Sequence, residues 1–506
     1  MTEVRAGDVA REGEEPQAGP GGGLGIGALA QDAAIYGGAR VLLKSLAFLL
    51  VPLYAHFLAP AQFGVLELVL ATIAFVDVLI AANMDGVFAR FYFDRPDEGW
   101  RRQIISLYLA IAAFYPTVVI GGLIALSGPL SGRIFGTTEY TLFLVIALCD
   151  LYLTNIVDLP MLLCRVRRKP VTFAVYSLSR GLVQVVFAVL FVAVFHLGVK
   201  GILLSSLIAV GFALLVTARE YLGDLTRKVD WGVGREMVEF AWPGILGGMA
   251  FYGLNLIDRF FVKHYHGLAD AGLYGTAFRY SQVVLVAVFA FRLGWTSWHY
   301  SWLHSGRHTQ MVARGANYYF VATGFLAVVV SAWILPVFHV LMPESYREAT
   351  TAVAPLALAA VALGAYNIFV VGLNVTKRMR IAPVLSLSAA ALAIGLYFLL
   401  IPRFSFQGAA WATASSFAAL ALLTAFVTQR IYPVPWDVRR ILLAVGLAAA
   451  LCLAALWLDR NVDLDASLPL RAVLTLAFPG ALLALGFFRG SELGRARALL
   501  RRGRSS

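Results

Sequence analysis

Residues 45–80 read SLAFLLVPLYAHFLAPAQFGVLELVLATIAFVDVLI, two apolar runs that meet at a short turn around Pro60. A helix that crosses a bilayer needs about 20 mainly apolar residues, and each run reaches that length together with its flanking residues. Runs of the same kind recur along the whole chain, separated by breakers such as Pro170, Gly198 and Pro343. The repeated pattern predicts an all-α, polytopic membrane protein with no large domain outside the bilayer.

Fourteen segments are predicted to span the membrane. They cover residues 31–58, 63–91, 103–127, 139–164, 171–196, 200–219, 237–263, 271–298, 312–342, 348–373, 381–402, 407–429, 440–458 and 470–488. The composition agrees with this prediction, because 60% of the 506 residues are hydrophobic and 14% are charged, with a mean hydropathy of +0.78. Soluble domains are about one quarter charged, so the composition excludes an ordinary soluble protein.

The basic residues predict the orientation of the chain. The formal net charge is +12 and the pI is 9.7, which in a soluble chain would suggest nucleic acid as a partner. Here 27 of the 41 Lys and Arg lie in the two tails and in alternate loops, 7 lie in the other loops and 7 lie within spans. An excess of basic residues in cytosolic loops is the positive-inside rule. The sequence therefore predicts cytosolic N- and C-termini and no nucleic-acid partner.

The sequence offers no signal for a cofactor. Cys149, Cys164 and Cys452 all lie in apolar segments and form no CxxC pair. No Gly-Lys dipeptide occurs, so the chain has no phosphate-binding loop for ATP. We expect no cofactor and no metal site, and any energy input would come from H⁺, Na⁺ or the membrane potential.

A weak internal repeat relates two turns. LAPAQFGV at residues 58–65 and GLADAGLY at residues 267–274 match when Gly64 is aligned with Gly272. Internal repeats are common in transporters. We therefore expect a disordered cytosolic tail (1–28), an N-terminal six-helix lobe (29–221), a cytosolic linker (222–236), a C-terminal six-helix lobe (237–431), two extra transmembrane helices (432–488) and a basic cytosolic tail (489–506).

Basic residues within the predicted spans are candidates for binding a substrate. A charge at the centre of a spanning helix costs roughly 2.5–3.5 kcal/mol on insertion scales, so such residues face the bundle interior or a wet cavity. Cations in a low-dielectric cleft attract anions, and arginine matches phosphate with two parallel hydrogen bonds. Most of these residues lie on the first two spans of each lobe, which predicts a cationic cavity between the lobes. The candidate substrate-binding residues are Arg40, Lys44, Arg180, Arg259, Arg279 and Arg292.

Structural roles stay open for several of these charges. Arg292, like Arg90, could extend along its helix to the inner membrane interface. Arg180 could pair with Asp150 as a buried lock within the bundle. Arg40 and Lys44 lie four residues apart and so share one face of the first span.

Carboxylates within the spans are candidates for a coupling or counter-ion role. They are Asp77, Glu67, Asp85 and Asp258. Asp77 could serve either as a counter-ion to Lys44 or as a binding site for a coupling cation. Asp258 could pair with a residue of a neighbouring helix. The sequence does not choose between these roles.

Four stretches carry a resemblance to a known family. VPLYAHFLAPAQFG (51–64) has the early proline and tyrosine, the leucine, the short turn and the glycine that opens the second span, and ARFY (89–92) closes that span. NLIDRF (255–260) and GLY (272–274) match the seventh and eighth spans. Over roughly residues 30–430 the chain resembles the Wzx-type polysaccharide-biosynthesis flippases of the MOP superfamily, which also contains the lipid II flippases and the MATE exporters.

The resemblance implies a function. It implies two six-helix lobes around a central cavity that opens alternately to each side and accepts a polyprenyl-diphosphate-linked oligosaccharide, with the lipid tail in a groove between helices. The cavity cations of the family would correspond to Arg40, Lys44 and Arg279, with Arg259 or Arg292 as further members. It also implies a bacterial cytoplasmic membrane, with the lipid-linked oligosaccharide and membrane lipids as partners. Whether a polysaccharide polymerase is a further partner stays open. We expect a monomer that is not an enzyme.

Two other classes of membrane protein stay open. A MATE-like exporter of small organic cations should have an acidic cavity, and Glu67, Asp77 and Asp85 suit one. The other class is a membrane-embedded glycan polymerase, ligase or acyltransferase. Such enzymes usually need a large outer loop or a histidine beside a carboxylate in the membrane, and this sequence predicts neither feature.

Overall fold

The computed structural model describes residues 26–81, 84–303 and 305–487, and some side chains within its helices are not described. The described residues form helices and turns, without a strand. The predicted tails lie outside the described residues, except that the first helix already begins at Ile26. The α-helices are α1 (Ile26–Phe57), α2 (Pro60–Ala81), α3 (Met84–Tyr92), α4 (Glu98–Ala125), α5 (Ser127–Phe135), α6 (Thr141–Val166), α7 (Pro170–Val189), α8 (Gly198–Thr217), α9 (Trp231–Leu256), α10 (Asp258–His266), α11 (Leu268–Ser301), α12 (His308–Leu341), α13 (Thr350–Phe369), α14 (Val371–Val375), α15 (Ile381–Ile431), α16 (Val438–Asn461) and α17 (Leu464–Ala484).

The helices confirm the predicted class of a multi-pass membrane protein. Within the part of the chain that the structure describes, 11 helical segments are long and apolar enough to cross a membrane. The predicted spans 381–402 and 407–429 form one of them, α15, which bends at Ser405 with φ 49° and ψ −136°. The seventh predicted span is divided between α9 and α10. The count of fourteen spans stays a prediction.

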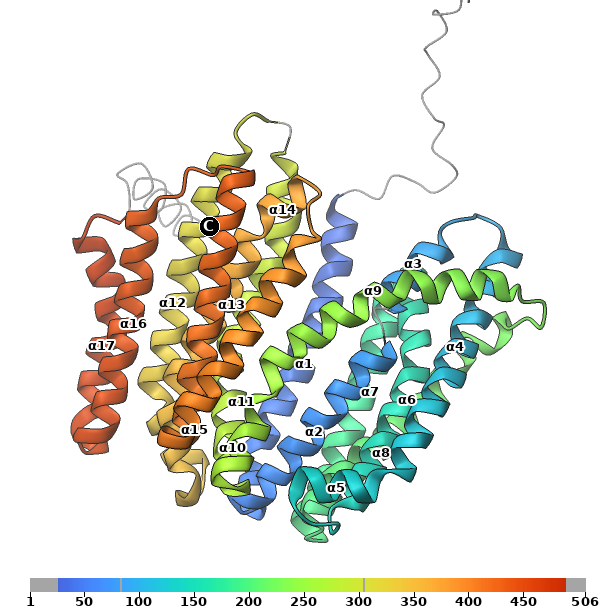
Figure 1. Ribbon diagram of the computed structural model, residues 1–506, viewed down its shortest axis with the longest axis horizontal. Coiled ribbons are helices and arrows are strands. Elements are labelled where there is room, and N and C mark those ends of the chain that lie inside the picture. Colours follow the sequence, from blue (N-terminus) through green and yellow to red (C-terminus); the bar gives the residue numbers. More distant parts are fainter. Residues whose placement is uncertain (1–25, 82–83, 304, 488–506) are drawn as a thin grey trace, which may run out of the picture.

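The helices form two groups that diverge toward one end of the molecule (Figure 1). The N-terminal group contains α1 to α8 and the C-terminal group contains α10 to α17, while α9 runs from one group to the other. The groups separate toward the end at which α1 begins. They converge at the opposite end, where α2 meets α10 and α11. This arrangement makes the boundary between α2 and α11 the place to look for a functional site.

Aspartates cap three helices at the end of the molecule where α1 begins. The Asp97 side chain accepts a hydrogen bond from the Trp100 backbone N–H at 2.8 Å, at the start of α4. Asp230 and Asp437 accept backbone hydrogen bonds in the same way at the starts of α9 and α16. A side-chain oxygen at this position satisfies a backbone donor that has no partner within the helix. These caps fix where each helix begins after its polar loop.

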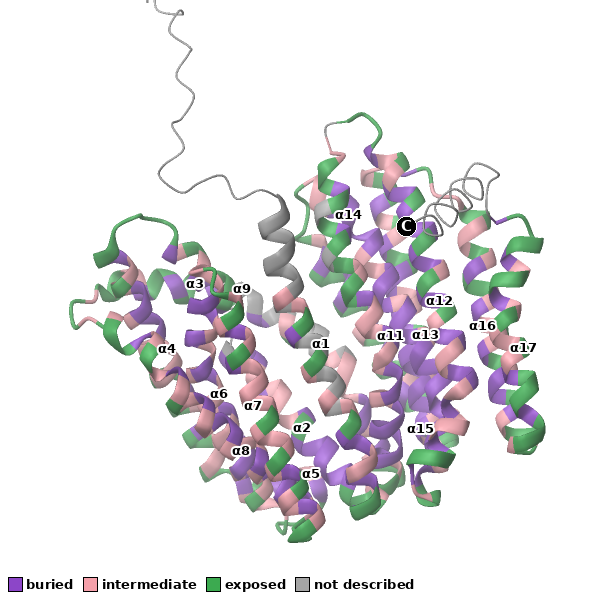
Figure 2. Ribbon diagram, turned by 180° about the vertical axis from the view of Figure 1, so that it is seen from behind, coloured by how far each residue is buried: buried purple, intermediate pink, exposed green. Residues whose placement is uncertain are grey.

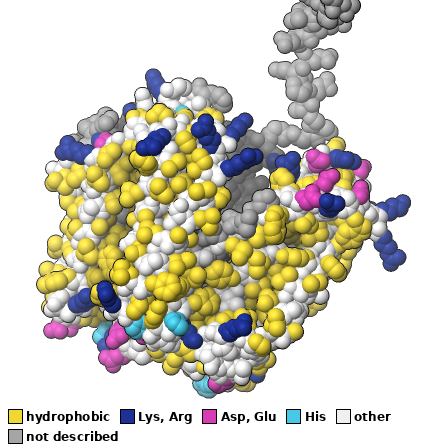
Figure 3. Space-filling model, in the orientation of Figure 1, with side chains coloured by type: hydrophobic (Ala, Val, Ile, Leu, Met, Phe, Trp, Pro, Cys, Tyr) yellow, Lys and Arg dark blue, Asp and Glu magenta, His cyan; other side chains and the backbone are white. Residues whose placement is uncertain are grey.

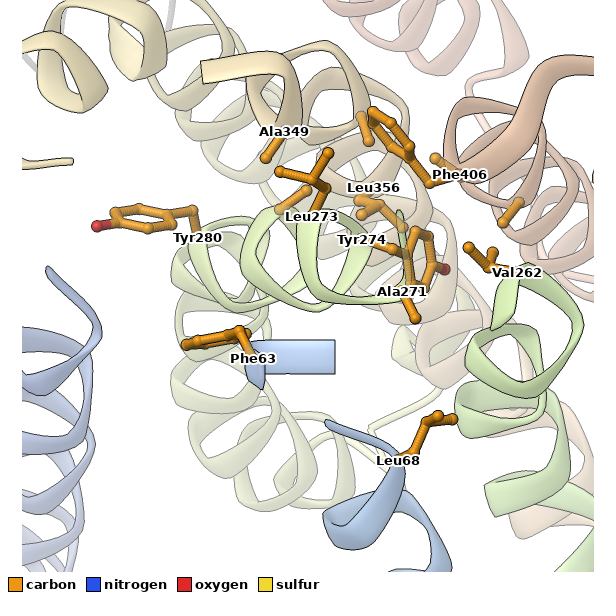
Figure 4. Packing of buried hydrophobic residues seen from close by; sticks show 14 of the residues in the cluster. Phe63, Leu68, Val262, Ala271, Leu273, Tyr274, Tyr280, Ala349, Leu356 and Phe406 are labelled. Carbon is orange, nitrogen blue, oxygen red and sulfur yellow. The ribbon is translucent and has the colours of Figure 1, made fainter. Parts of the chain in front are cut away.

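The largest apolar core lies where α2 packs against α11. Phe63 and Leu68 of α2 lie on one side of α11, and Leu356 of α13 lies close to Tyr274 of α11 (Figure 4). Figure 2 shows the buried residues gathered along α11, α13 and α15. Between helices in a bilayer, close van der Waals packing stabilises such a contact. The converging end is therefore tightly packed.

One buried arginine helps to join the two C-terminal helices to α12. Arg471 of α17 is 0% exposed, donates to the carbonyl oxygen of Ala332 on α12 at 2.6 Å and lies 2.7 Å from Asp459 of α16. Helix α17 begins at Leu464, before the predicted span 470–488, so Arg471 lies inside the helix and not in an outer loop. The buried ion pair joins three helices at this point.

Charged side chains are unevenly distributed on the outer surface. On the face shown in Figure 3, hydrophobic side chains cover the middle, and more Lys and Arg lie toward the end at which α1 begins than toward the opposite end. Basic residues concentrate on the cytosolic side of membrane proteins. The distribution agrees with the charge pattern of the loops, and the cytosolic location of the termini stays a prediction.

Candidate functional site

One carboxylate of α2 lies between two arginines of the C-terminal group. Glu67 is 5% exposed, and its Oε1 lies 2.6 Å from a guanidinium nitrogen of Arg279 on α11. Its Oε2 lies 3.3 Å from Nε of Arg259 on α10. Removing one partner of a buried ion pair is strongly destabilising, because the other charge is left uncompensated. Glu67 therefore ties the two groups together at their converging end.

Arg259 has several further partners besides Glu67. Its Nη1 lies 2.9 Å from Oδ1 of Asp258 and 3.0 Å from the carbonyl oxygen of Asn255. Asp258 in turn accepts a hydrogen bond from the Tyr274 hydroxyl through Oδ2. We call Glu67, Asp258, Arg259 and Arg279 the Glu67 network. Its two positive and two negative charges balance, as charges buried in a bundle require.

A glycine of α11 makes room for Glu67. A Cβ atom added at Gly275 would lie 2.2 Å from Cγ of Glu67, far inside a van der Waals contact. Above the network, the guanidinium of Arg259 lies 4.3 Å from the ring centroid of Phe278, and that of Arg279 lies 5.3 Å from the ring centroid of Phe63. Aromatic faces attract cations, so both arginines are held by rings as well as by carboxylates.

Arg279 also faces a cavity at the boundary between the two groups. Its side chain is 26% exposed, and the cavity of about 140 Å³ is further lined by Asp150, Gln184 and Ser206 of the N-terminal group. A second cavity of about 290 Å³ is lined by Arg180 and lies between α1, α6 and α7. Leu50 and Gln184 line both cavities. Two of the predicted cations therefore face open space near the middle of the helices.

The other predicted cations are placed differently. Only the helix backbone is described at Arg40 and Lys44, so the predicted contacts of their side chains lie outside the described residues. Arg292 is exposed, with its guanidinium 5.4 Å from the ring centroid of Phe289. The structure thus brings Arg259 and Arg279 together, places Arg180 at the neighbouring cavity and leaves Arg292 at the surface.

Arg180 and Asp150, whose pairing the sequence leaves open, do not form a close ion pair. Arg180 donates to Oγ1 of Thr154 at 3.1 Å, and Oδ1 of Asp150 is buried without a hydrogen-bond partner among the described residues. Sequence reasoning placed Asp150 within a span but did not point to Gln184 or Ser206. Neither residue type is unusual in a helix, and only the packing of α6, α7 and α8 brings them to one cavity.

The remaining predicted carboxylates lie away from the Glu67 network. Asp85 is exposed and forms an ion pair with Arg165 at 3.3 Å. Asp77 is half-buried on α2 and forms no ion pair with another described residue. No three His, Cys, Asp or Glu side chains converge on a metal position in the part of the chain that is described.

An apolar cavity of about 660 Å³ lies beside the N-terminal group. It is bounded by α2, α3, α4 and α9, with Met84, Phe114, Trp231 and Trp242 in its lining. Both tryptophans are more than half exposed. Tryptophan is enriched where a membrane protein meets the polar edge of the bilayer, so this cavity is a candidate for holding a lipid chain.

The sequence matches the polysaccharide biosynthesis protein family over residues 29–292. The chain belongs to this family. The matched region, more than half of the chain, includes all four residues of the Glu67 network and the lining residues of the cavities next to Arg279 and Arg180. No curated protein matches the sequence.

Solved structures with a similar fold support the family assignment at the level of architecture. The lipid II flippase MurJ in an inward closed conformation is 11% identical, with a TM-score of 0.68, covering 88% of this chain and 98% of that chain. An inward-facing multidrug resistance MATE family transporter of the MOP superfamily is 12% identical, with a TM-score of 0.63, covering 77% of this chain and 93% of that chain. This member of the polysaccharide biosynthesis family therefore shares the MOP fold.

Proposed function

We propose that the chain is a flippase that moves a polyprenyl-diphosphate-linked oligosaccharide from the inner to the outer leaflet of a bacterial cytoplasmic membrane, for cell-surface polysaccharide synthesis. The position of Arg279 carries the proposal. It lies at the boundary between the two groups, faces a cavity and binds Glu67 through Nε and one terminal nitrogen, while its Nη1 donates to no described residue.

The free edge of Arg279 suits a diphosphate. A diphosphate is a strong anion, and an arginine edge offers it charge-assisted hydrogen bonds of defined direction. The low dielectric of the surrounding helices strengthens the attraction relative to water. Arg40 and Lys44, four residues apart on α1, would supply further positive charge nearer the diverging end, and Arg180 and Arg292 are the remaining candidates for contact with the substrate.

The Glu67 network supports alternating access. The groups are joined by Glu67 at the converging end, so this state is closed there, and they diverge toward the end at which α1 begins. In the proposed orientation that end is cytosolic. Opening the converging end requires Glu67 to leave Arg259 and Arg279. Coupling to H⁺, Na⁺ or the membrane potential would drive that step, with Glu67, Asp77, Asp85 and Asp258 as its candidate carboxylates.

The lipid chain needs an apolar path. The cavity beside α4 and α9 has an almost wholly apolar lining and is bordered by Trp231 and Trp242. A polyprenyl chain that follows it would remain in an apolar environment while the diphosphate enters between the groups. The proposal also includes the domain boundaries predicted from the sequence, a monomeric state and a polysaccharide polymerase as a partner.

Flipping in proteoliposomes tests this function. A fluorescent undecaprenyl-diphosphate sugar in the inner leaflet would become accessible to an external quencher with the wild type. Arg279→Ala should insert normally and lose flipping, whereas Arg227→Ala, an exposed arginine of the linker, should flip at the wild-type rate. Absence of flipping by wild-type protein that is correctly inserted would exclude the proposal.

A MATE-like exporter is the second candidate. Asp77 of α2 and Asp158 of α6 are half-buried in the N-terminal group, and the exposed Asp85 lies on α3 of the same group. An acidic interior favours an organic cation. If this candidate is right, the same proteoliposomes, loaded with a fluorescent organic cation, would transport that cation. The Asp77→Asn variant should then lose this transport, and the Arg279→Ala variant should keep it.

A further inference from the structure

Two neighbouring cavities, which share Leu50 and Gln184 in their linings, contain polar groups with unused hydrogen-bonding capacity. We call them together the Asp150 pocket, which contains Asp150 of α6, Arg180 and Gln184 of α7 and Ser206 of α8. Asp150 and Arg180 each lie near the middle of their helix. The pocket therefore lies near mid-depth in the membrane, where transporters commonly bind their substrates.

The polar groups of the pocket are only partly satisfied. Oδ1 of Asp150 is buried without a partner among the described residues, and Ser206 lines the same cavity as Asp150. The Gln184 amide forms no hydrogen bond with a described residue, and Arg180 donates to Thr154 alone. A buried polar atom without a partner costs about 1–3 kcal/mol. A ligand that offers both donors and acceptors would remove this cost.

The mixture of charges narrows the class of ligand. An anion in the pocket would meet the Asp150 carboxylate, and an inorganic cation would meet the guanidinium groups of Arg180 and Arg279. A hydroxyl group can both donate and accept a hydrogen bond. An uncharged polyol can therefore donate to the Asp150 carboxylate and accept from the Gln184 amide and the guanidinium groups at the same time. Drug-sized ligands occupy cavities of about 300–1,000 Å³. Cavities of about 140 and 290 Å³ therefore suit a single sugar ring and not a long glycan.

We propose that the Asp150 pocket binds the sugar that is attached directly to the diphosphate. This inference rests on the proposed function, because Arg279 lines the same cavity and would hold the diphosphate beside the pocket. Asp150 accepts a hydrogen bond from one sugar hydroxyl. Gln184 and Arg180 donate to the ring substituents, while Leu50 lies against the ring. These side chains would select which first sugar the protein carries.

Binding of paired lipids to the full-length protein in nanodiscs tests the inference. The probes are undecaprenyl diphosphate and the same lipid carrying glucose, galactose or N-acetylglucosamine, and the readout is equilibrium affinity. Asp150→Asn should weaken binding of at least one sugar-linked lipid by about tenfold, or about 1.4 kcal/mol, and leave binding of undecaprenyl diphosphate unchanged. Arg279→Ala should weaken binding of every lipid.

A pair of adjacent serines provides a matched control. Ser206→Ala should also weaken binding of the sugar-linked lipid, by a smaller factor than Asp150→Asn does. Ser205→Ala should have none, because that hydroxyl donates to the Ile202 carbonyl of its own helix. Ser206→Ala also keeps the test valid if Asp150→Asn fails to insert.

Three outcomes would overturn the inference. The first is unchanged affinity of Asp150→Asn and Ser206→Ala for every sugar-linked lipid. The second is an equal loss for lipids with and without sugar, which would assign Asp150 to the diphosphate or to the fold. The third is unchanged binding with loss of gradient-driven flipping, which would make Asp150 a coupling residue. If the wild type binds neither kind of lipid, the proposed function itself fails along with the inference.

Discussion

Gly64 and Gly272 meet reciprocally at the converging end of the molecule. A Cβ atom added at Gly64 would lie 1.9 Å from the carbonyl oxygen of Leu268, and one added at Gly272 would lie 1.9 Å from the carbonyl oxygen of Pro60. Each glycine thus lies against the carbonyl four residues before the other. The alignment of the two turns predicted from the sequence pairs these same glycines, so the weak repeat coincides with a near-symmetric contact between α2 and α11.

Alanine at either glycine should keep this end from closing. The clashing atoms belong to the backbone and cannot rotate away, so Gly64→Ala and Gly272→Ala should lower flipping by at least about tenfold. A cysteine introduced at Leu70, in a chain without its three native cysteines, should react faster with a membrane-impermeant maleimide from the outer side. Gly211→Ala meets no atom within 4 Å and serves as the control. Wild-type flipping by both variants would show that the close approach is dispensable.

Neutralising Glu67 should loosen the same end. Glu67→Gln keeps the shape of the side chain but leaves Arg259 and Arg279 without their shared carboxylate, which favours separation of the groups. We expect loss of flipping and greater outer accessibility, measured with the same maleimide assay. The exposed pair Arg235–Glu239 provides the control, because Glu239→Gln should change neither quantity. A Glu67→Gln variant with normal flipping and closure would remove the network from the mechanism.

Arg279→Lys should separate charge from geometry. Lysine retains the positive charge but cannot present two parallel donors, so it should keep the pair with Glu67 and still bind undecaprenyl diphosphate more weakly. We expect affinity intermediate between the wild type and Arg279→Ala, measured in nanodiscs. Equal affinity of the lysine variant and the wild type would mean that Arg279 acts through charge alone.

Arg471 should matter for stability more than for transport. Arg471→Met leaves the carboxylate of Asp459 buried and unpaired, and breaking such a pair costs about 3–5 kcal/mol. The thermal unfolding midpoint of the purified protein should fall clearly, and Asp459→Asn combined with Arg471→Met should recover part of the loss. Arg460→Ala, which removes an exposed arginine bonded to Gln407, should leave the midpoint near that of the wild type. A normal midpoint for Arg471→Met would contradict this account.

The sequence determined the class of the protein and the kinds of chemistry available to it. Apolar runs of spanning length, with Lys and Arg in alternate loops, leave a multi-pass helical bundle as the only way to satisfy the backbone in lipid. The positions of Glu67, Arg259 and Arg279 within apolar segments also marked them as functional candidates, because isolated charges there are costly.

Only the tertiary structure decided which of these charges meet. Glu67 is separated by about 200 residues from Arg259 and Arg279, and helix periodicity carries no information about contacts between distant helices. The structure joined them, left Arg180 and Asp150 without a close ion pair between them, in two neighbouring cavities, and placed Arg292 at the surface. Local patterns fix the helices, whereas the partner of each buried charge depends on how those helices cross.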